Sequence, residues 1–482
     1  MATASVPRVM VAATSSGAGK TTVTCGLLRL LARQGLSPRA CKCGPDFIDP
    51  MFHREVVGVP SRNLDLYLSG EADVRRLLAK GADGEGVTVV EGVMGYYDGV
   101  GLTDEASSWD VARRTETPCV LVVDARGRAR TLAAEVVGVR RMREDSRVAG
   151  VVLNRASAAA FPALRRAVEE ESGVPVLGYL PQLEGAALES RHLGLVTAAE
   201  VERLGEKVDL VADALAETLD VEALLALARQ APPLAYEPRG LAPVAAGARV
   251  AVARDEAFCF YYEDALDTLH ELGCELVGFS PLSDGRLPED ACGLYLGGGY
   301  PELHAAALEA NARMRAEVAR AVRSGLPTVA ECGGFLYLHD ALEGADGTWY
   351  EMAGVVHARA FRCDRLRRFG YVGLESRVDG LLAARGGALR AHEFHYWDSE
   401  DPGASFSATK PRSGRSWECV HATPTLHAGF PHVDLYSEVG AATRFARACR
   451  DYARRAGGPG APGGPGAVGG PGADAGAGVS AS

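Results

Sequence analysis

The sequence contains no apolar run that approaches the ~18 residues a membrane-spanning helix needs. Its first residues lack the basic segment, apolar stretch and cleavage site of a secretory leader. It also lacks a basic run, and its formal net charge of -11 would repel nucleic acid and anionic membranes. The eleven cysteines are scattered, several of them within apolar runs, which suits buried reduced thiols. We therefore expect a cytoplasmic protein without a nucleic-acid or membrane partner.

The residues that are present divide the chain into two globular parts. Its 482 residues exceed what one hydrophobic core usually holds, so two or three domains are expected. In the first half, runs such as RVMVAAT, GVTVVEGVMG, PCVLVVDA and VAGVVLNRA alternate with helical patterns, which predicts a parallel sheet covered by helices. A second such series begins at ARVAVARD. We expect α/β domains over 1–230 and 249–455, a Pro/Ala-rich linker over 231–248 and a disordered Gly/Pro/Ala tail over 456–482.

The motif TSSGAGKTT lies between the first strand-like run and a helical pattern, and it is typical of a loop that binds phosphate. The match is relaxed, because Thr14 stands where the pattern begins with glycine. Glycines let backbone amides converge on phosphate oxygens, the lysine adds a positive charge, and the threonine hydroxyl can hold Mg²⁺. An ordinary glycine turn is the plain alternative. The residues expected to bind ATP here are Gly17, Gly19, Lys20, Thr21 and Thr22.

Acidic residues follow two further strand-like runs of the first domain. CKCGPDFIDP carries Lys42, Asp46 and Asp49, and TVVEGVMGYYDG carries Glu91 at a strand end and Asp98 after a glycine-rich turn. In a phosphate-loop protein, carboxylates at these strand ends are well placed to hold Mg²⁺, and the lysine can neutralise a phosphoryl group in transfer. The alternative for the first motif is a proline-bounded loop with solvated charges.

The second half contains a candidate nucleophile in GLPTVAECGGFLYL. Cys332 follows a strand-like run and precedes a glycine pair, which resembles a nucleophile elbow. Gly333, together with Gly298 and Gly299 of LYLGGGYPE, would supply backbone amides for an oxyanion and for glutamine. An isolated cysteine is more often buried and structural, so a base is needed to support the catalytic interpretation.

That base is expected in HAGFPHVDLYSE, where His432 can take the thiol proton and Asp434 or Glu438 can orient the imidazole. RAHEFHYWD contains His392, Glu393 and His395. A metal site needs a third ligand with suitable spacing on one face, and none is evident here. We assign its His395 a structural or substrate-contacting role. CKC at 41–43 is spaced too tightly for an ordinary zinc site.

Together these motifs resemble the cobyrinic acid a,c-diamide synthase family, including its hydrogenobyrinic acid counterpart. The resemblance covers about 7–455 and rests on SSGAGKTT, KCGPDFIDP, RNLDLYL, VVEGVMGYYDG, LVVDARG, GVVLNR, RHLGLV, ARDEAFCFYYEDAL, YLGGGYPELHA, AECGGFLYL, HEFHY and GFPHVDLYS. It implies a phosphate-loop synthetase domain with a doubly wound parallel sheet, related to dethiobiotin synthetase, followed by a glutaminase domain like those of class I amidotransferases. It also implies that ATP turns the a and c acetate carboxylates of a corrin ring into acyl phosphates, and that ammonia from glutamine captures them.

The resemblance assigns roles to residues of this chain. For the ATP centre it implies Lys20, Thr21, Asp46, Glu91 and Asp98, with Asn154 near the adenine. We further expect Thr21, Asp46 and Glu91 to hold Mg²⁺, Lys42 to act in catalysis, and Asp49, Asp98 and His395 to face the substrate. For the thiol centre it implies Cys332 as nucleophile and His432 as base.

Two positions depart from the family pattern. Asp434 stands where the family has a second histidine, which makes an acidic partner for His432 more attractive. Phe47 stands where tyrosine is frequent, so a hydroxyl contact to the substrate at that point is absent. The tail lies outside the resemblance.

Two other functions remain open at this stage. A paralogue that amidates another tetrapyrrole or polycarboxylate would carry the same ATP and glutamine motifs. A nucleotide-dependent switch protein would share the phosphate loop but would not need Cys332 or His432. Self-association as a homodimer is compatible with either.

Overall fold

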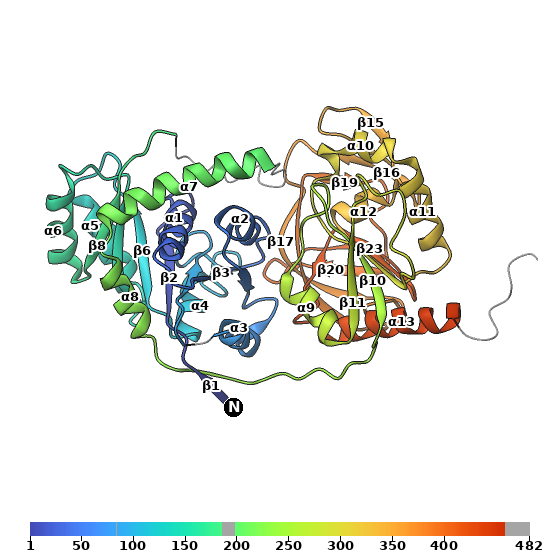
Figure 1. Ribbon diagram of the computed structural model, residues 1–482, viewed down its shortest axis with the longest axis horizontal. Helices are drawn as coiled ribbons and strands as arrows, with labels where there is room; N and C mark the ends of the chain where they lie inside the picture. Colours follow the sequence, from blue (N-terminus) through green and yellow to red (C-terminus); the bar gives the residue numbers. More distant parts are fainter. Residues whose placement is uncertain (83, 186–197, 458–482) are drawn as a thin grey trace, which may run out of the picture.

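The computed structural model describes residues 1–82, 84–185 and 198–457, which form two α/β units side by side (Figure 1). The first unit ends with helix α8 (Val221–Arg229) and the second begins with strand β10 (Ala248–Ala253). Both are built around a mainly parallel sheet, so the expected α/β class is confirmed. No helix in the described part of the chain is long and apolar enough to cross a membrane.

The first unit contains a seven-stranded parallel sheet in the order β4-β3-β5-β2-β6-β7-β8. Its central strand is buried along its whole length, as expected for a parallel sheet covered on both faces. All the carboxyl ends lie at the same edge, where the ligand-binding loops of such folds gather. The strands are β2 (Arg8–Ala13), β3 (Arg39–Cys43), β4 (Ser61–Leu64), β5 (Thr88–Glu91), β6 (Cys119–Asp124), β7 (Val148–Asn154) and β8 (Val176–Leu180).

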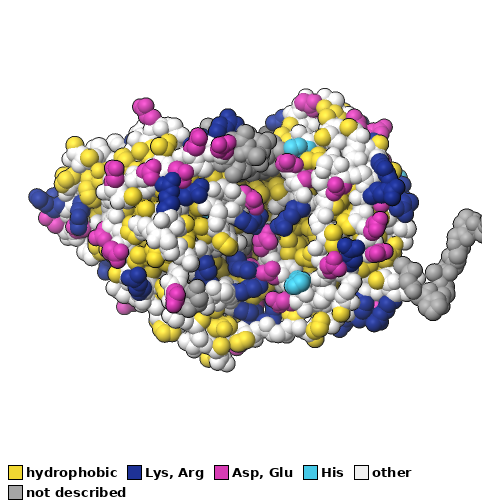
Figure 2. Space-filling view, viewed as in Figure 1, with side chains coloured by type: hydrophobic (Ala, Val, Ile, Leu, Met, Phe, Trp, Pro, Cys, Tyr) yellow, Lys and Arg dark blue, Asp and Glu magenta, His cyan; other side chains and the backbone are white. Residues whose placement is uncertain are grey.

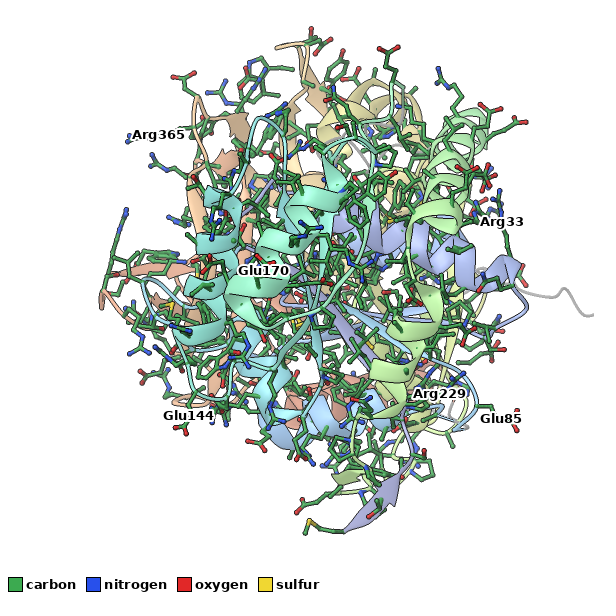
Figure 3. All side chains as sticks on the ribbon, turned by 90° about the vertical axis from the view of Figure 1, so that its left-hand side faces the viewer. Arg33, Glu85, Glu144, Glu170, Arg229 and Arg365 are labelled. Carbon is green, nitrogen blue, oxygen red and sulfur yellow. The ribbon has the colours of Figure 1, made fainter. Side chains whose placement is uncertain are left out.

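Helices cover both faces of this sheet and form a separate hydrophobic core on each. One face carries α1 (Lys20–Arg33), α7 (Ala198–Thr218) and α8, together with the π-helical segment η1 (His53–Val57) that continues α2 (Ile48–Phe52). The other face carries α3 (Gly70–Ala79), α4 (Ser108–Arg114), α5 (Thr131–Arg141) and α6 (Phe161–Ser172). Figure 3 shows charged side chains such as Glu170 and Arg229 projecting outward from these helices.

The second unit has a six-stranded sheet in the order β11-β10-β12-β13-β23-β22, parallel except for β22. Besides β10, its strands are β11 (Cys274–Phe279), β12 (Gly293–Leu296), β13 (Thr328–Glu331), β22 (His421–Thr423) and β23 (Leu426–Gly429). Its helices are α9 (Glu263–Glu271), η2 (Pro301–Leu303), α10 (Ala305–Ala310), α11 (Ala312–Arg323), α12 (Gly333–Tyr337) and α13 (Val439–Gly457).

Two smaller sheets complete the second unit. One has the order β21-β20-β17-β18-β24 and is antiparallel, and the other has the order β15-β14-β16-β19. Figure 1 places β17 beside the first unit. The strands are β14 (His339–Glu343), β15 (Trp349–Glu351), β16 (Val356–Arg362), β17 (Arg368–Ser376), β18 (Ala388–His395), β19 (Trp397–Ser399), β20 (Phe406–Thr409), β21 (Ser416–Cys419) and β24 (His432–Val433).

The segment expected as a linker, 231–248, contains a short strand. β9 (Leu234–Tyr236) pairs antiparallel with β1 (Ala2–Ala4) at the N-terminus, and the chain then passes along the lower edge in Figure 1 to the second unit. Most of the expected tail, from residue 458 onward, lies outside the described residues.

Opposite charges meet along the seam between the units, and Figure 2 shows Lys, Arg, Asp and Glu side chains gathered there. In three of these pairs the basic residue comes from the first unit and the acidic residue from α9 of the second. Arg54 bonds Glu263 at 2.6 Å, Lys80 bonds Asp267 at 2.8 Å, and Arg62 pairs with Asp264. These pairs set the units in register, although each half-exposed pair adds only about 1 kcal/mol or less.

Candidate active site: two facing centres

The phosphate-binding loop joins β2 to α1 and has the backbone that its sequence predicts. Gly19 has φ +98°, a left-handed conformation that favours glycine. A Cβ atom added at Gly19 would lie 2.0 Å from Nδ2 of Asn154, so the loop has no room for a side chain there. That Nδ2 donates to the Ala18 carbonyl oxygen at 2.8 Å. Asn154, which was expected near the adenine, therefore holds the loop from the end of β7.

Lys20 and Thr21 begin α1 and direct their side chains into this centre. Burial, with a contribution from nearby Lys42, lowers the pKa of Lys20. The Thr21 hydroxyl donates to Oε1 of Glu91 at 2.6 Å. Backbone amides at a helix start attract anions, so this corner suits phosphate groups.

Glu91, at the end of β5, lies at the middle of the first centre and is fully buried. Besides Thr21, its carboxylate accepts hydrogen bonds from Lys42 Nζ at 3.1 Å and His53 Nε2 at 2.9 Å. Burial alone would raise the pKa of this carboxyl, but Lys42 and His53 lower it well below its usual range. Glu91 is therefore an anion, and His53 is a partner that the sequence analysis missed.

Lys42 connects two acidic residues of the centre. Its ammonium pairs with Asp49 and with Glu91, and it also donates to the Gly92 carbonyl oxygen at 3.1 Å. Burial opposes the charged form, but Asp49 and Glu91 raise the pKa of Lys42 well above its usual value. Asp49 is thus an ion-pair partner of Lys42 in this structure.

Two of the predicted acidic residues, Asp46 and Asp98, accept hydrogen bonds from backbone N–H groups of their own turns. Oδ1 of Asp46 accepts the backbone N–H of Ile48 at 2.8 Å and of Asp49 at 3.2 Å, so it shapes the turn before α2. Oδ2 of Asp98 accepts the Gly95 N–H at 2.9 Å. A Cβ atom at Gly95 would lie 2.9 Å from the Thr14 carbonyl oxygen, which places the Asp98 turn against the phosphate-binding loop.

The oxygen donors of the first centre fit a hard cation such as Mg²⁺. Thr21 Oγ1 and Glu91 Oε1 lie 2.6 Å apart, and an ionised carboxylate beside a hydroxyl at a phosphate-binding loop is the donor type that Mg²⁺ prefers. No cluster of three or more His, Cys, Asp or Glu with metal-binding geometry occurs among the described residues. Protein ligands alone therefore do not complete a metal shell, and phosphate oxygens and water would have to supply the rest.

The second centre begins at Cys332, between the end of β13 and the start of α12. Its backbone has φ +48°, which costs about 1–3 kcal/mol for a residue other than glycine. This sharp turn gives Cys332 the backbone of a nucleophile elbow. The residue is 7% exposed, so its sulfur lies in a nearly closed site.

The His432 ring lies beside that thiol, and the carboxylate next to it is that of Glu331. Oε2 of Glu331 lies 3.6 Å from His432 Nδ1, and its Oε1 accepts the Val433 N–H at 2.9 Å. Burial disfavours a charged ring, but the neighbouring Cys332 and Glu331 side chains raise the pKa of His432 to about 10. The His432 ring is therefore placed to exchange a proton with the thiol.

The residues that were expected to orient His432 have other contacts. Asp434 accepts hydrogen bonds from the Ser437 hydroxyl at 2.6 Å and the Tyr436 N–H at 3.0 Å. Glu438 accepts the Arg390 N–H at 3.0 Å. Strand β24 ends at Val433, so Asp434 lies beyond the strand and its side chain bonds the turn that follows. The sequence offered one indication of the actual partner, because Glu331 directly precedes the nucleophile.

Three glycines let backbone segments pack closely beside Cys332 and His432. A Cβ atom at Gly298 would lie 2.6 Å from Cε1 of His432, one at Gly299 would lie 2.1 Å from the Ala257 carbonyl oxygen, and one at Gly333 would lie 2.9 Å from the Gly299 nitrogen. The amides of Gly299 and Gly333 are thus neighbours. Since Gly333 is the first residue of α12, its N–H has no acceptor one turn earlier in that helix.

His395, which was expected to face the substrate, points into the second unit instead. It is 4% exposed, and its ring stacks on Phe430 with 4.0 Å between centroids. Its Nδ1–H donates to the Trp397 carbonyl oxygen at 2.5 Å, and Glu393 lies 3.6 Å from Nε2. The alternation of β18 explains this, since His395 shares the inward face with Glu393.

One aromatic ring from the first unit touches the second centre. Phe47, between Asp46 and Asp49, stacks on Tyr262 at 4.3 Å and on Phe260 at 5.3 Å, and it lies 4.9 Å from the His432 ring. The Tyr262 hydroxyl also donates to the Pro45 carbonyl oxygen at 3.2 Å. A single short segment therefore contributes to both centres, and the two centres face each other.

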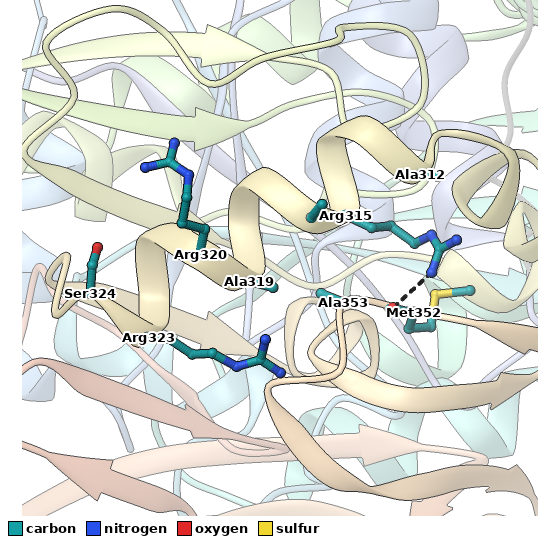
Figure 4. A pocket seen from close by; sticks show the side chains of 9 residues that line it. Ala312, Arg315, Ala319, Arg320, Arg323, Ser324, Met352 and Ala353 are labelled. Atoms are coloured by element: carbon teal, nitrogen blue, oxygen red, sulfur yellow. Dashed lines mark hydrogen bonds between the residues drawn. The ribbon is translucent and has the colours of Figure 1, made fainter. Parts of the chain in front are cut away.

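The hollow in Figure 4 lies elsewhere, on α11 and the chain after β15. Arg315 crosses it and donates to the Met352 carbonyl oxygen at 3.1 Å. It contains neither the phosphate-binding loop nor the thiol, so it is not the candidate site.

Comparisons with known proteins match both units. The family model of the CobQ/CobB/MinD/ParA nucleotide binding domain matches residues 9–196, and that of the CobB/CobQ-like glutamine amidotransferase domain matches residues 249–423. Three relatives carry the name cobyrinate a,c-diamide synthase. The protein of Caldanaerobacter subterraneus subsp. tengcongensis is 38% identical over 92% of this chain and 99% of its own length. That of Thermoplasma volcanium is 37% identical over 93% and 99%, and that of Salmonella typhimurium 40% identical over 88% and 94%.

Proposed function

This chain belongs to the cobyrinate a,c-diamide synthase family, and from that premise we propose that it amidates the a and c acetate carboxylates of cobyrinic or hydrogenobyrinic acid. Its domains make it a glutamine-dependent amidating ligase with a nucleotide-binding unit. The nucleotide is ATP and the nitrogen donor is L-glutamine. A cytoplasmic location is supported by the cysteines, which form no disulfide among the described residues.

At the second centre, the Cys332 thiolate attacks the side-chain carbonyl carbon of glutamine. The oxyanion accepts hydrogen bonds from the adjacent amides of Gly299 and Gly333. The imidazolium of His432 gives its proton to the departing nitrogen, so the C–N bond breaks and ammonia leaves a thioester behind. Water, deprotonated by the now neutral His432, then cleaves the thioester and releases glutamate. Glu331 keeps the ring oriented through both steps.

At the first centre, a substrate carboxylate attacks the γ-phosphorus of ATP and forms an acyl phosphate with release of ADP. A carboxylate resists ammonia at neutral pH, and phosphorylation supplies a good leaving group. Lys20 and Lys42 neutralise negative charge on the transferred group, as the phosphate-binding loop aligns it. Ammonia then attacks the acyl carbon and displaces inorganic phosphate.

Thr21 and Glu91 would hold Mg²⁺ at this centre, and Asp46 is a further candidate. The ion would supply positive charge near the phosphates. Asp49 and Asp98 border the same region from the α2 turn and from the turn against the phosphate-binding loop. We assign them to positioning of the substrate, Asp49 through its ion pair with Lys42.

The observation that carries this proposal is the segment around Phe47. Its neighbours Asp46 and Asp49 belong to the ATP centre, and its ring lies 4.9 Å from His432. A synthetase that captures ammonia from a separate site needs the two sites to face each other, because free ammonia is protonated and diluted in bulk water. The contact supports transfer across this seam.

Mass analysis of the products tests the proposal directly. Cobyrinic acid and hydrogenobyrinic acid are each incubated with the protein, MgATP and glutamine. Conversion of two carboxyl groups to amides in either ring is expected, with one glutamate and one ADP formed per amide. Unchanged masses for both rings would overturn the corrin assignment and favour a paralogue acting on another polycarboxylate.

A further inference from the structure

An aromatic surface is exposed on the outer face of β17 and β18, beyond the part that the first unit covers. Phe369, Phe394 and Tyr396 are 55%, 47% and 45% exposed. Phe369 lies directly opposite Phe394 in the β17–β18 pairing, with ring centroids 5.6 Å apart, and Tyr396 follows at 5.9 Å from Phe394. Contiguous exposed aromatics of this kind mark binding surfaces rather than scattered surface residues. We call these three residues the aromatic platform.

The platform is continuous with the two centres through a row of rings on the same face. Phe369 lies 6.1 Å from His392, and His392 lies 5.7 Å from Tyr371. His392 is paired in register with His432 of β24. Tyr371 bonds Asp65 of the first unit at 2.8 Å. The platform thus begins at the edge of the contact between the two units.

Tyr371 is the member of this row that lies nearest the ATP centre. Its hydroxyl lies 3.9 Å from a Cβ atom built at Gly44, in the segment that carries Asp46 and Asp49. The row of rings therefore leads from the platform to the segment that borders the ATP centre. A flat ring system with several flexible acid arms has that shape.

Positive charge borders the platform on the β20–β21 hairpin. Lys410 Nζ donates to the backbone carbonyl oxygens of Phe369 and Tyr371, the latter at 3.1 Å. Arg412 pairs across the seam with Glu105, and Arg415 is exposed beside them. Arg365, which precedes β17, projects outward in Figure 3. These cations stand out in a chain of net charge -11, and they complement a ligand that is apolar in the middle and acidic at its edge.

We propose that the aromatic platform binds one face of the tetrapyrrole macrocycle, while the hairpin cations and Arg365 bind its peripheral carboxylates. This inference rests on the proposed function, since it takes a corrin polycarboxylate as the substrate. Stacking holds the ring at the mouth of the seam and leaves an acetate arm free to reach the ATP centre. The same placement explains how two different arms are amidated, because a ring held by its face can be released and rebound in a rotated position.

The direct test measures binding of cobyrinic acid to the full chain by ultrafiltration, with the corrin followed by its visible absorption. Phe369→Ser, Phe394→Ser and the double variant are compared with wild type. Trp349→Ser is the matched control, because Trp349 is an aromatic residue of the same unit, 42% exposed, on β15. We expect the double variant to bind at least about 10-fold more weakly, because it loses two stacking rings, and the control to stay within twofold of wild type.

Kinetics of the same proteins distinguish a loss of corrin binding from a general loss of folded, active enzyme. The double variant should raise KM for cobyrinic acid and leave KM for ATP and the glutamine hydrolysis rate unchanged. Arg415→Gln should weaken corrin binding about threefold and reduce its dependence on added salt.

Corrin binding by the double variant within twofold of the control overturns the platform, and so does a loss of self-association in light scattering without a loss of corrin binding. If wild-type protein neither binds nor amidates cobyrinic and hydrogenobyrinic acid, the proposed function fails first and the platform loses its ligand with it.

Discussion

The two centres are built on opposite principles. The ATP centre is a network of charges from β3, β5, α1 and the α2 segment, in which Lys42 already pairs with Glu91 and Asp49. The thiol centre rests on one strained residue, Cys332, with a single base and a single carboxylate behind it. The first has to exchange an internal ion pair for contacts with its ligands. The second holds its reactive geometry in advance.

The comparison predicts that losses at the thiol centre are specific to one nitrogen source, whereas losses at the ATP centre are not. Cys332→Ala should lower glutamine-dependent amidation by at least about 1000-fold, because no other group supplies the nucleophile. Amidation with ammonium chloride should stay within twofold of wild type. Both rates are followed by amide formation, with Cys363→Ala as the control thiol. Loss of both activities would contradict the separation of the centres.

Glu91→Gln probes the other side of the comparison. Glutamine keeps a hydrogen-bond acceptor for Thr21 but removes the negative charge that compensates Lys42 and would hold Mg²⁺. Amidation should fall about 100-fold with either nitrogen source, since electrostatic groups in transfer sites are worth several kcal/mol. Glutamine hydrolysis measured without ATP should persist. Glu144→Gln, on the outer surface, is the matched control, and an effect confined to glutamine would count against this role.

Glu331→Gln tests whether the preset geometry depends on its carboxylate. Removing that charge should lower the pKa of His432 from about 10 toward its ordinary value. Glutamine hydrolysis should fall about 10-fold, and the pH profile of Cys332 alkylation by iodoacetamide should shift. Asp434→Asn serves as the comparison, because its side chain bonds Ser437 and Tyr436 instead. A larger effect from Asp434→Asn would reverse the assignment.

Phe47→Ala addresses the contact that joins the centres. Without the ring, ammonia should leak into solvent, so the glutamate formed per amide should rise from near one to about two or more. Each centre should keep its own partial reaction, since the ring carries no charge and makes only modest stacking contacts. Phe47→Tyr should restore tight coupling. A ratio that stays near one in Phe47→Ala would show that the ring has only a packing role.

The smallest expected effect concerns stability. The pKa of His432 is about 10 in the folded chain against an ordinary value of about 6.5. A raised folded-state pKa contributes stability that is fully present below about pH 6.5 and is lost as pH rises through about 10. The Tm advantage of wild type over His432→Gln should therefore shrink by a few degrees between pH 6.5 and pH 10. A growing advantage would contradict a charged imidazole.

Features encoded by neighbouring residues were predicted more often than contacts between distant segments. The apolar runs identified β2, β5, β6 and β7, because a parallel strand buried on both faces reads as continuous hydrophobicity. Glu91 was found because it ends such a strand. The contact of Phe47 with His432 has no local pattern, since the two residues come from different units. The antiparallel sheet of β17 and β18 was missed for a different reason, because these strands mix charged, polar and aromatic residues and form no continuous apolar run.

The third member of the Cys–His site shows the limit most clearly. Asp434 was expected from its spacing to His432 along one strand. The actual geometry is set by where β13 ends beside β24, which brings Glu331 to the ring instead. Spacing within a strand gives the side on which a residue lies but not the neighbour it meets there.

The pairing of β9 with β1 has a consequence for how the two units find each other. By anchoring residues 234–236 to the first unit, it leaves only 237–247 as the tether to the second. A shorter tether raises the effective concentration of one unit around the other. Trimming the first few residues would leave β9 held to the first unit by α3 alone, where Arg75 donates to the Ala235 carbonyl oxygen at 2.7 Å. That loosening would let the halves drift apart more often without altering a single group that performs the chemistry.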